Sequence, residues 1–154
     1  MSVPVFVDTN ILIYQQDISD PVKQLRADDW ITFLARGRWA RISFQVLQEL
    51  YATLTRKLEP QFDPSEAQEI VRELAVWQPL AADLSILERS WLLQQRYSLS
   101  WWDALIVASA QACECMVLLT EDLQHGQVLG SLRVINPFMS PDQAPVEILK
   151  ALEK

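Results

Sequence analysis

Short apolar runs and longer amphipathic segments alternate along this chain. The first run, Val5-Phe6-Val7, consists of β-branched and aromatic residues, which predicts a strand buried on both faces. Similar runs predict short strands at 39–42, 116–119 and 132–135. Between them apolar residues recur at helical spacing, which predicts helices ending at about 16 and spanning 21–37, 43–58, 64–76, 84–97 and 101–113. Strands separated by helices predict an α/β fold of three α/β/α layers with a mostly parallel central sheet.

Capping residues set the helix boundaries. Asp20-Pro21 and Asp63-Pro64 each place a cap before a proline, which fits the first helical position because that N–H has no helical partner. The helix over 101–113 is apolar nearly all round, so we expect it in the middle of the fold. Residues 77–80 are ambiguous and fit a short edge strand, since Pro79 disfavours a central one.

Length and composition indicate an ordinary globular protein. The 154 residues are most simply one domain, in which 139–154 form a polar link and a short helix over 146–152. No apolar run approaches the roughly 20 residues of a membrane helix, and no secretory signal opens the chain, so we expect a cytoplasmic protein. His125 is the only histidine, and Cys113 and Cys115 have no second pair, which nearly excludes a zinc site and favours reduced, buried thiols.

The net charge of −7 bears on nucleic-acid binding. A protein that holds nucleic acid by bulk electrostatics needs a basic surface, so this charge argues against that mode of binding. It leaves open an enzyme that contacts phosphates through a bound metal and a few arginines.

Four carboxylates are the candidate functional residues. Asp8 and Asp122 each come just after a predicted parallel strand, and Asp103 lies in the first turn of the apolar helix. In a parallel sheet the strand ends and the following helix starts gather at one edge, so we expect these acids to converge. Glu49, on the helix after the second strand, can point to the same edge.

Such a cluster predicts a bound cation. Two unit charges about 4 Å apart repel by roughly 4 kcal/mol at an effective dielectric constant near 20. Without a counter-charge some of the carboxylates would take up protons. A hard divalent cation removes the repulsion, and Mg²⁺ and Mn²⁺ both prefer oxygen ligands.

Each acid also has a purely structural interpretation. Asp8 can cap the helix that follows it, and Asp103 can form a capping box with Ser100. Asp122 fits turn chemistry in Thr-Glu-Asp, and Glu49 lies away from the apolar stripe of its helix, as a solvated glutamate would. Taken singly, none of the four is specific.

Taken together, four motifs resemble a PIN domain, and most closely the VapC-type toxin ribonucleases of bacterial toxin–antitoxin systems. The motifs are Val7-Asp8-Thr9-Asn10-Ile11-Leu12, Gln48-Glu49-Leu50-Tyr51, Trp102-Asp103-Ala104-Leu105-Ile106 and Leu119-Thr120-Glu121-Asp122. The resemblance covers roughly 3–138, which places the nuclease domain at 1–138 and leaves 139–154 as a C-terminal tail.

The resemblance implies a Rossmann-like sheet and an endonuclease that cuts RNA with one or two Mg²⁺ or Mn²⁺ ions. It assigns the catalytic and metal-binding roles to Asp8, Glu49, Asp103 and Asp122. Polar helpers fall on Asn10 and Thr120, and the pattern leaves the role of Glu121 open. Family members commonly form homodimers and are inhibited by a cognate antitoxin that lies across the acidic groove.

Contacts with RNA would come from a few cations and an aromatic side chain. The candidate cations are Arg36, Arg38, Arg41, Arg56 and Arg96. Trp101 or Trp102 can stack on a base, although core packing is the favoured role for at least one of them.

Two other functions compete with this interpretation. A phosphatase with a strand-end aspartate nucleophile usually needs a second acid two residues on, where this chain has Asn10. A catalytically inert PIN-like module that binds protein would use the acids only as helix caps, and the acidic composition is compatible with it.

Overall fold

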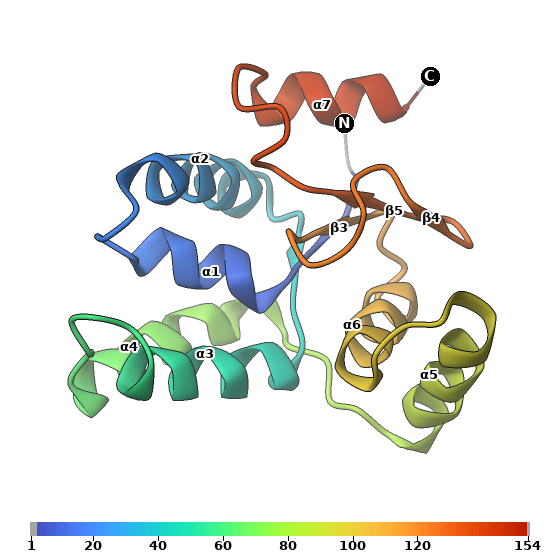
Figure 1. Cartoon of the computed structure of the whole chain (residues 1–154), viewed down its shortest axis with the longest axis horizontal. Helices are drawn as coiled ribbons and strands as arrows, with labels where there is room; N and C mark the ends of the chain where they lie inside the picture. Colours follow the sequence, from blue (N-terminus) through green and yellow to red (C-terminus); the bar gives the residue numbers. More distant parts are fainter. Residues whose placement is uncertain (1–2, 154) are drawn as a thin grey trace.

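The structure, a computed structural model, describes residues 3–153. In that range five strands form one sheet in the order β2-β1-β3-β5-β4 (Figure 1). The strands are β1 Val5–Val7, β2 Ala40–Arg41, β3 Val117–Leu119, β4 Val128–Leu129 and β5 Leu132–Ile135. Strand β1 pairs in parallel with β2 and β3, and β3 with β5, whereas β4 runs antiparallel to β5. The predicted mostly parallel sheet is therefore confirmed.

Helices lie on both sides of this sheet. They are α1 Thr9–Gln16, α2 Pro21–Gly37, α3 Phe44–Arg56, α4 Pro64–Leu74, α5 Leu84–Tyr97, α6 Trp101–Ala112 and α7 Pro145–Leu152, with a 3₁₀ helix, η1, over Ala75–Trp77. Figure 1 shows α7 on one side of β3 and β5, and α5 and α6 on the other. Within 3–153 no helix combines the length and apolarity needed to cross a bilayer. The three α/β/α layers are as predicted.

The capping residues act largely as the sequence indicates. Asp20 accepts a hydrogen bond from the Lys23 backbone N–H at the start of α2, and Ser100 accepts one from the Asp103 N–H at the start of α6. Asp63 is the N-cap of α4, but its carboxylate accepts from the Ser65 hydroxyl and makes no cap hydrogen bond. Proline at the first position is enough to start that helix.

The main differences from the predicted elements lie in short segments. Strand β4 was not expected, because two residues carry no periodicity, and it turns into β5 through Gly130 at a φ of +66°. Residues 75–77 form a 3₁₀ helix, and only Leu80 of the ambiguous segment pairs with the sheet edge, by a bridge to Ser43. The predicted edge strand over 77–80 is thus reduced to one residue.

Helix α6 lies at the centre of the molecule, as its composition predicts. Ala104, Val107 and Ala108 are fully buried. The short C-terminal helix is also present as α7, and it packs on α2 with Leu149 buried. These contacts fix the sheet whose carboxyl-terminal edge carries the candidate site.

Candidate functional site

Asp8 joins the end of β1 to the start of α1. Its backbone N–H donates to the Leu119 carbonyl at 3.0 Å, which continues the pairing of β1 with β3 by one residue. Its backbone is still extended, and Oδ1 accepts from the Thr9 N–H at 2.7 Å, so Asp8 is the N-cap of α1. The predicted capping role is therefore real, and it uses only one of the two carboxylate oxygens.

The second oxygen of Asp8 lies among polar side chains in the interior. Oδ2 accepts from the Thr120 hydroxyl at 2.7 Å and from the Asn10 amide at 3.2 Å, and the residue is only 6% exposed. Burial raises the pKa of the Asp8 carboxyl from 3.8 to about 7, against the hydrogen bonds from Thr120 and Thr9 and with the help of the charges on Asp122 and Glu49. Asp8 therefore exchanges its proton near neutral pH.

Asn10 links Asp8 to Asp122. Its Nδ2 lies 3.2 Å from Asp8 Oδ2, 3.1 Å from Thr120 Oγ1 and 3.0 Å from Asp122 Oδ2. An amide nitrogen carries two hydrogens, which suffice for the two carboxylates, because Thr120 Oγ1 also accepts from the Asp122 N–H. The amide is neutral, so it leaves the charges of the two carboxylates uncompensated.

Asp122 lies two residues beyond the end of β3. Its backbone N–H donates to the Thr120 hydroxyl at 3.1 Å, which closes a tight turn and directs the carboxylate back toward Asn10. Partial burial raises the pKa of this carboxyl, the Asn10 hydrogen bond opposes the rise, and the charges on Asp103, Glu121 and Glu49 add to it. Two neighbouring carboxyls are thus biased toward the protonated state.

Glu49 approaches the same place from α3. Its Oε2 accepts from the Thr9 hydroxyl at 3.0 Å, and its Oε1 accepts from the Gln45 amide at 2.7 Å, one helical turn earlier. Both oxygens are thereby oriented, and the side chain is only partly exposed. Glu49 is therefore directed into the site, which the solvated interpretation of its helical position did not indicate.

Asp103 stands apart from the other three acids. Its backbone N–H completes the cap on Ser100 at 3.2 Å. Its carboxylate lies near enough to Asp122 to raise the pKa of that group, but it does not line the pocket that the other acids share. Asp8, Glu49 and Asp122 therefore share a pocket, and Asp103, at its margin, acts on Asp122 through its charge.

Asp8, Glu49 and Asp122 line a pocket of about 610 Å³, which we call the acidic pocket. Its lining consists of Asp8, Thr9, Asn10, Ile13, Gln45, Gln48, Glu49, Ala52, Thr53, Lys57, Trp102 and Asp122. Gln45, Thr53 and Lys57 are lining residues that no sequence motif singles out. They recur every four residues with Glu49 along α3, so helical periodicity from Glu49 was the signal that would have found them.

The predicted RNA-contacting residues fall in different places. Trp102 is 62% exposed and lines the acidic pocket, whereas Trp101 packs against the core. The five candidate arginines do not line this pocket, and Arg38 and Arg41 line another one. Lys57 is the cation in the lining.

Glu121, the acid of unassigned role, points away from the acidic pocket. It accepts from the Tyr14 hydroxyl at 2.6 Å and pairs with the Lys23 ammonium at 2.9 Å. The Lys23 nitrogen also lies 4.6 Å from the centre of the Tyr14 ring, and its pKa is raised chiefly by the hydrogen bond to Glu121. Glu121 therefore anchors the Thr120–Asp122 turn to α1 and α2.

The donor chemistry of the acidic pocket fits a hard divalent cation. Every acidic ligand candidate offers carboxylate oxygen, and the Asn10 amide between Asp8 and Asp122 carries no charge to offset theirs, whereas a cation would. Within 3–153 no three acidic, histidine or cysteine side chains converge closely enough to enclose an ion as they stand.

Two solved structures share this fold. A toxin–antitoxin complex from Klebsiella pneumoniae gives a TM-score of 0.62 at 22% identity, covering 86% of this chain and 97% of that chain. VapBC2 from Rickettsia felis, solved bound to a DNA fragment from its promoter, gives 0.61 at 17% identity, also covering 86% and 97%. No curated protein matches the sequence. At these identities the likeness is one of fold.

A comparison of the sequence with family models identifies the family of this chain. The model of the PIN domain matches residues 5–128, which is most of the chain. The matched span contains all four acidic motifs on which the resemblance rests. The chain therefore belongs to the PIN domain family.

Proposed function

We propose that this chain is a divalent-metal-dependent endoribonuclease and the toxin of a toxin–antitoxin pair. The observation that carries the proposal is the position of Asp8. It is a nearly buried carboxylate at a strand end, joined through Asn10 to Asp122 and adjacent to Glu49. A protein without chemistry to perform gains nothing from crowding acids whose pKa values must rise.

The metal would be Mg²⁺ or Mn²⁺, as one or two ions. Asp8, Glu49 and Asp122 would hold it, and Asp103 at the margin would complete the acidic set. When bound, such an ion lowers the pKa of a water and stabilises charge on a phosphoryl oxygen. The phosphodiester of RNA is the substrate that this chemistry suits.

The surrounding side chains would position the substrate and the acids. Thr9 and Gln45 fix the two oxygens of Glu49, and Thr120 holds Asp8 Oδ2 at 2.7 Å. Lys57 supplies a positive charge for a phosphate, and the exposed Trp102 offers a face on which a base can stack. Each is a contact that the chain itself provides.

The toxin assignment rests on the family and on the structural neighbours. One similar structure is described as a toxin–antitoxin complex, and the other as VapBC2 bound to a DNA fragment from its promoter. We infer that this chain likewise has a protein antitoxin that covers the acidic pocket, and that it works as a homodimer. The phosphatase alternative is disfavoured, since the side chain two residues after Asp8 is the Asn10 amide.

Metal removal provides the direct test of the nuclease. Purified protein is expected to cut a structured RNA in Mg²⁺ or Mn²⁺ and to stop when EDTA is added, because the crowded acids repel a phosphate unless a cation intervenes. The measurement is gel analysis of end-labelled RNA, with readdition of metal as the control. No cutting in either metal, together with no heat of Mn²⁺ binding by calorimetry, would leave the inert protein-binding module as the better interpretation.

Growth provides the test of the toxin. Induced expression in a bacterial host without a partner gene is expected to arrest growth, because RNA cleavage without an antitoxin is unrestrained. The measurement is colony formation after induction, compared with equal expression of the Asp8→Asn variant. Unimpaired growth at a protein level that cuts RNA in the extract would contradict the toxin role and leave the nuclease in place.

A further inference from the structure

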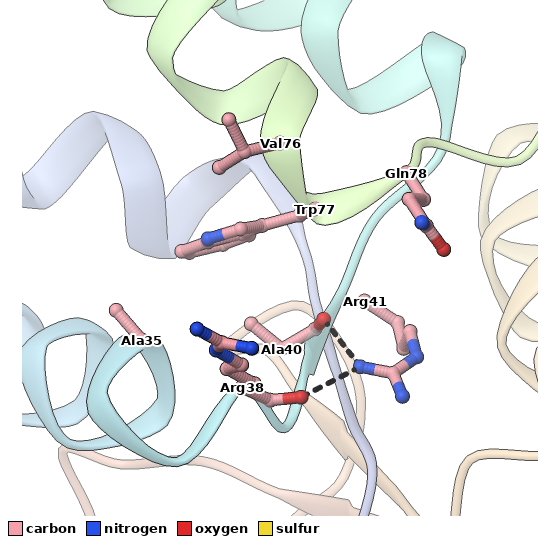
Figure 2. Close-up of a pocket in the computed structure, with 7 residues that line it drawn as sticks. All are labelled: Ala35, Arg38, Ala40, Arg41, Val76, Trp77 and Gln78. Atoms are coloured by element: carbon pink, nitrogen blue, oxygen red, sulfur yellow. Dashed lines mark hydrogen bonds between the residues drawn. The ribbon is translucent and has the colours of Figure 1, made fainter.

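A second pocket lies at the outer edge of the sheet, beside β2. Figure 2 shows that three elements form its walls. They are the end of α2 with Ala35 and Arg38, strand β2 with Ala40 and Arg41, and the 3₁₀ helix η1 with Val76 and Trp77. Its volume is about 510 Å³. We call it the arginine pocket, and nothing in the PIN chemistry of the acidic pocket uses it.

The two arginines form a basic spot on an acidic protein. The stretch between Asp29 and Glu49 contains three arginines, Arg36 among them, and no acidic residue, although the chain carries a net charge of −7. Across residues 3–153 the ion pairs are Lys23–Glu121 and Arg72–Glu69. Neither arginine of the pocket therefore faces a carboxylate in the described part of the chain.

The guanidinium of Arg41 is held in place by the backbone. Its Nη1 donates to the Arg38 carbonyl at 3.0 Å and to the Ala40 carbonyl at 2.9 Å, as Figure 2 shows. These bonds use the two hydrogens of Nη1 and leave the Nη2 and Nε hydrogens for an acceptor from outside. Arg41 is thus a fixed donor, with little side-chain entropy to lose on binding an anion.

Arg38 occupies a position where glycine is usual. It is the C-cap of α2 with a φ of +59°, a left-handed conformation that a side chain makes unfavourable. The glycine of this turn stands one residue earlier, because a Cβ on Gly37 would lie 2.6 Å from the Trp39 ring. Packing therefore explains Gly37 but gives no reason for an arginine at position 38.

Trp77 forms the opposite wall of the pocket. In Figure 2 its ring and the Arg38 guanidinium project into the pocket from opposite sides. The cations in cation–π contacts across residues 3–153 are Lys23, Arg26 and Arg96. Arg38 is not among them, so its guanidinium does not stack on the Trp77 ring and there is space between the two groups. A flat group can enter that space, with Val76, 77% exposed, at its rim.

We propose that the arginine pocket binds single-stranded RNA, with one phosphate on the Arg38 guanidinium, a base against Trp77 and a neighbouring phosphate on the Arg41 guanidinium, which Figure 2 shows on the other side of β2. Guanidinium forks suit phosphate oxygens, and an aromatic face beside a cation suits a base. An acidic peptide would engage the arginines but not the part of the indole that faces the pocket, the rest of which packs against the core. The identity of the polymer rests on the proposed nuclease function.

The position of the pocket fits a substrate that extends beyond the cleavage point. Ala40 pairs with Val5, three residues before Asp8 on the neighbouring strand. That offset is about 10 Å along the strand direction at about 3.3 Å per residue. Nucleotides flanking a phosphate in the acidic pocket would extend to the arginines, which would add positive contacts to the one that Lys57 supplies.

The test measures RNA binding without metal. A fluorescein-labelled single-stranded RNA of mixed sequence is titrated with the full chain in EDTA, and anisotropy gives the affinity at several salt concentrations. Arg38→Gly is expected to weaken binding roughly tenfold, as for the loss of one charged hydrogen-bonded contact. It should also reduce the salt slope by about 0.7 for the single phosphate released.

Three controls make the result decisive. Arg38→Gly also removes an unfavourable left-handed side chain, so its melting temperature should not fall, which separates binding from misfolding. Arg133→Ala removes an equal charge from β5, beyond β1 and β3, and should change affinity and slope little. A polyglutamate peptide of matched charge should bind no better to the wild type than to Arg38→Gly.

The outcomes separate this proposal from the nuclease. Equal losses in Arg38→Gly and Arg133→Ala would show a bulk charge effect and overturn the proposal, as would peptide binding that depends on Arg38 while RNA binding does not. Metal-dependent cleavage by a protein whose Arg38→Gly variant binds RNA like the wild type would reject the arginine pocket alone. Arg38-dependent binding without any cleavage would support the pocket and reject the nuclease.

Discussion

Replacing Asp8 with asparagine is expected to lower metal-dependent RNA cleavage by roughly 100-fold or more, since even indirect partners of a metal site contribute about 10- to 100-fold. Asparagine has the same shape and keeps an oxygen for the Thr9 N–H, so the cap of α1 should survive. The lost feature is the negative charge at the centre of the acidic pocket. The measurement is the initial rate of cleavage at saturating Mn²⁺, with Mn²⁺ binding by calorimetry alongside.

The matched control is Asp28→Asn, the same substitution on the exposed surface of α2. It should cleave like the wild type. If Asp8→Asn retains more than a tenth of the wild-type rate and binds Mn²⁺ equally well, Asp8 is a structural cap and the centre of the proposed site lies elsewhere. A large loss of rate with no fall in melting temperature places Asp8 in the chemistry.

The positions at the strand ends could be read from the sequence because the backbone determines them. Val7 pairs with Leu119, so the residues that follow them, Asp8 and Thr120, lie side by side and form a hydrogen bond. Beyond Thr120 the chain leaves β3 in a turn, in which Asp122 faces Asn10 and Glu121 contacts Tyr14 and Lys23. Strand alternation does not extend into this turn, so the sequence pattern does not assign the role of Glu121.

The positions on helices were harder to predict, because they depend on how each helix is rotated against the sheet. Glu49 lies outside the apolar stripe of α3, and only the Thr9 hydroxyl 40 residues earlier shows that it faces the site. The Ser100 cap fixes the place of Asp103 in the first turn of α6. Its charge acts on Asp122, although its side chain does not line the acidic pocket.

The arginine pocket could not be predicted from local pattern. The sequence predicts that Arg38 and Arg41 contact RNA. That they line one pocket with Trp77 depends on the packing of η1 beside the edge strand β2. That contact rests on a single bridge, Ser43 with Leu80, in a segment whose sequence was ambiguous. Long-range packing of short irregular segments is what the periodicity of a sequence does not encode.

The second large effect is on stability in the absence of metal. The pKa of Asp8 is about 7 in the folded state and about 3.8 in the unfolded chain, so between these values the folded protein holds a proton that the unfolded chain releases. The free energy of unfolding should therefore fall as the pH rises from about 4 to about 7. At about 1.4 kcal/mol per unit this amounts to roughly 4 kcal/mol, and the loss is complete above pH 7. Asp122, whose pKa is also raised, acts in the same direction.

Urea unfolding in EDTA between pH 4.5 and 8.5 measures this effect, and the difference between wild type and Asp8→Asn isolates it from other titrating groups. The free energy of unfolding of the variant, relative to that of the wild type, should increase as the pH rises, because the asparagine has no charge to bury. At pH 8 Mn²⁺ should restore the wild type, by about 2.7 kcal/mol at 100 times its dissociation constant, and leave the variant unchanged. A constant difference across the pH range would mean that Asp8 ionises freely, and then no crowding of carboxylates would call for a cation at this site.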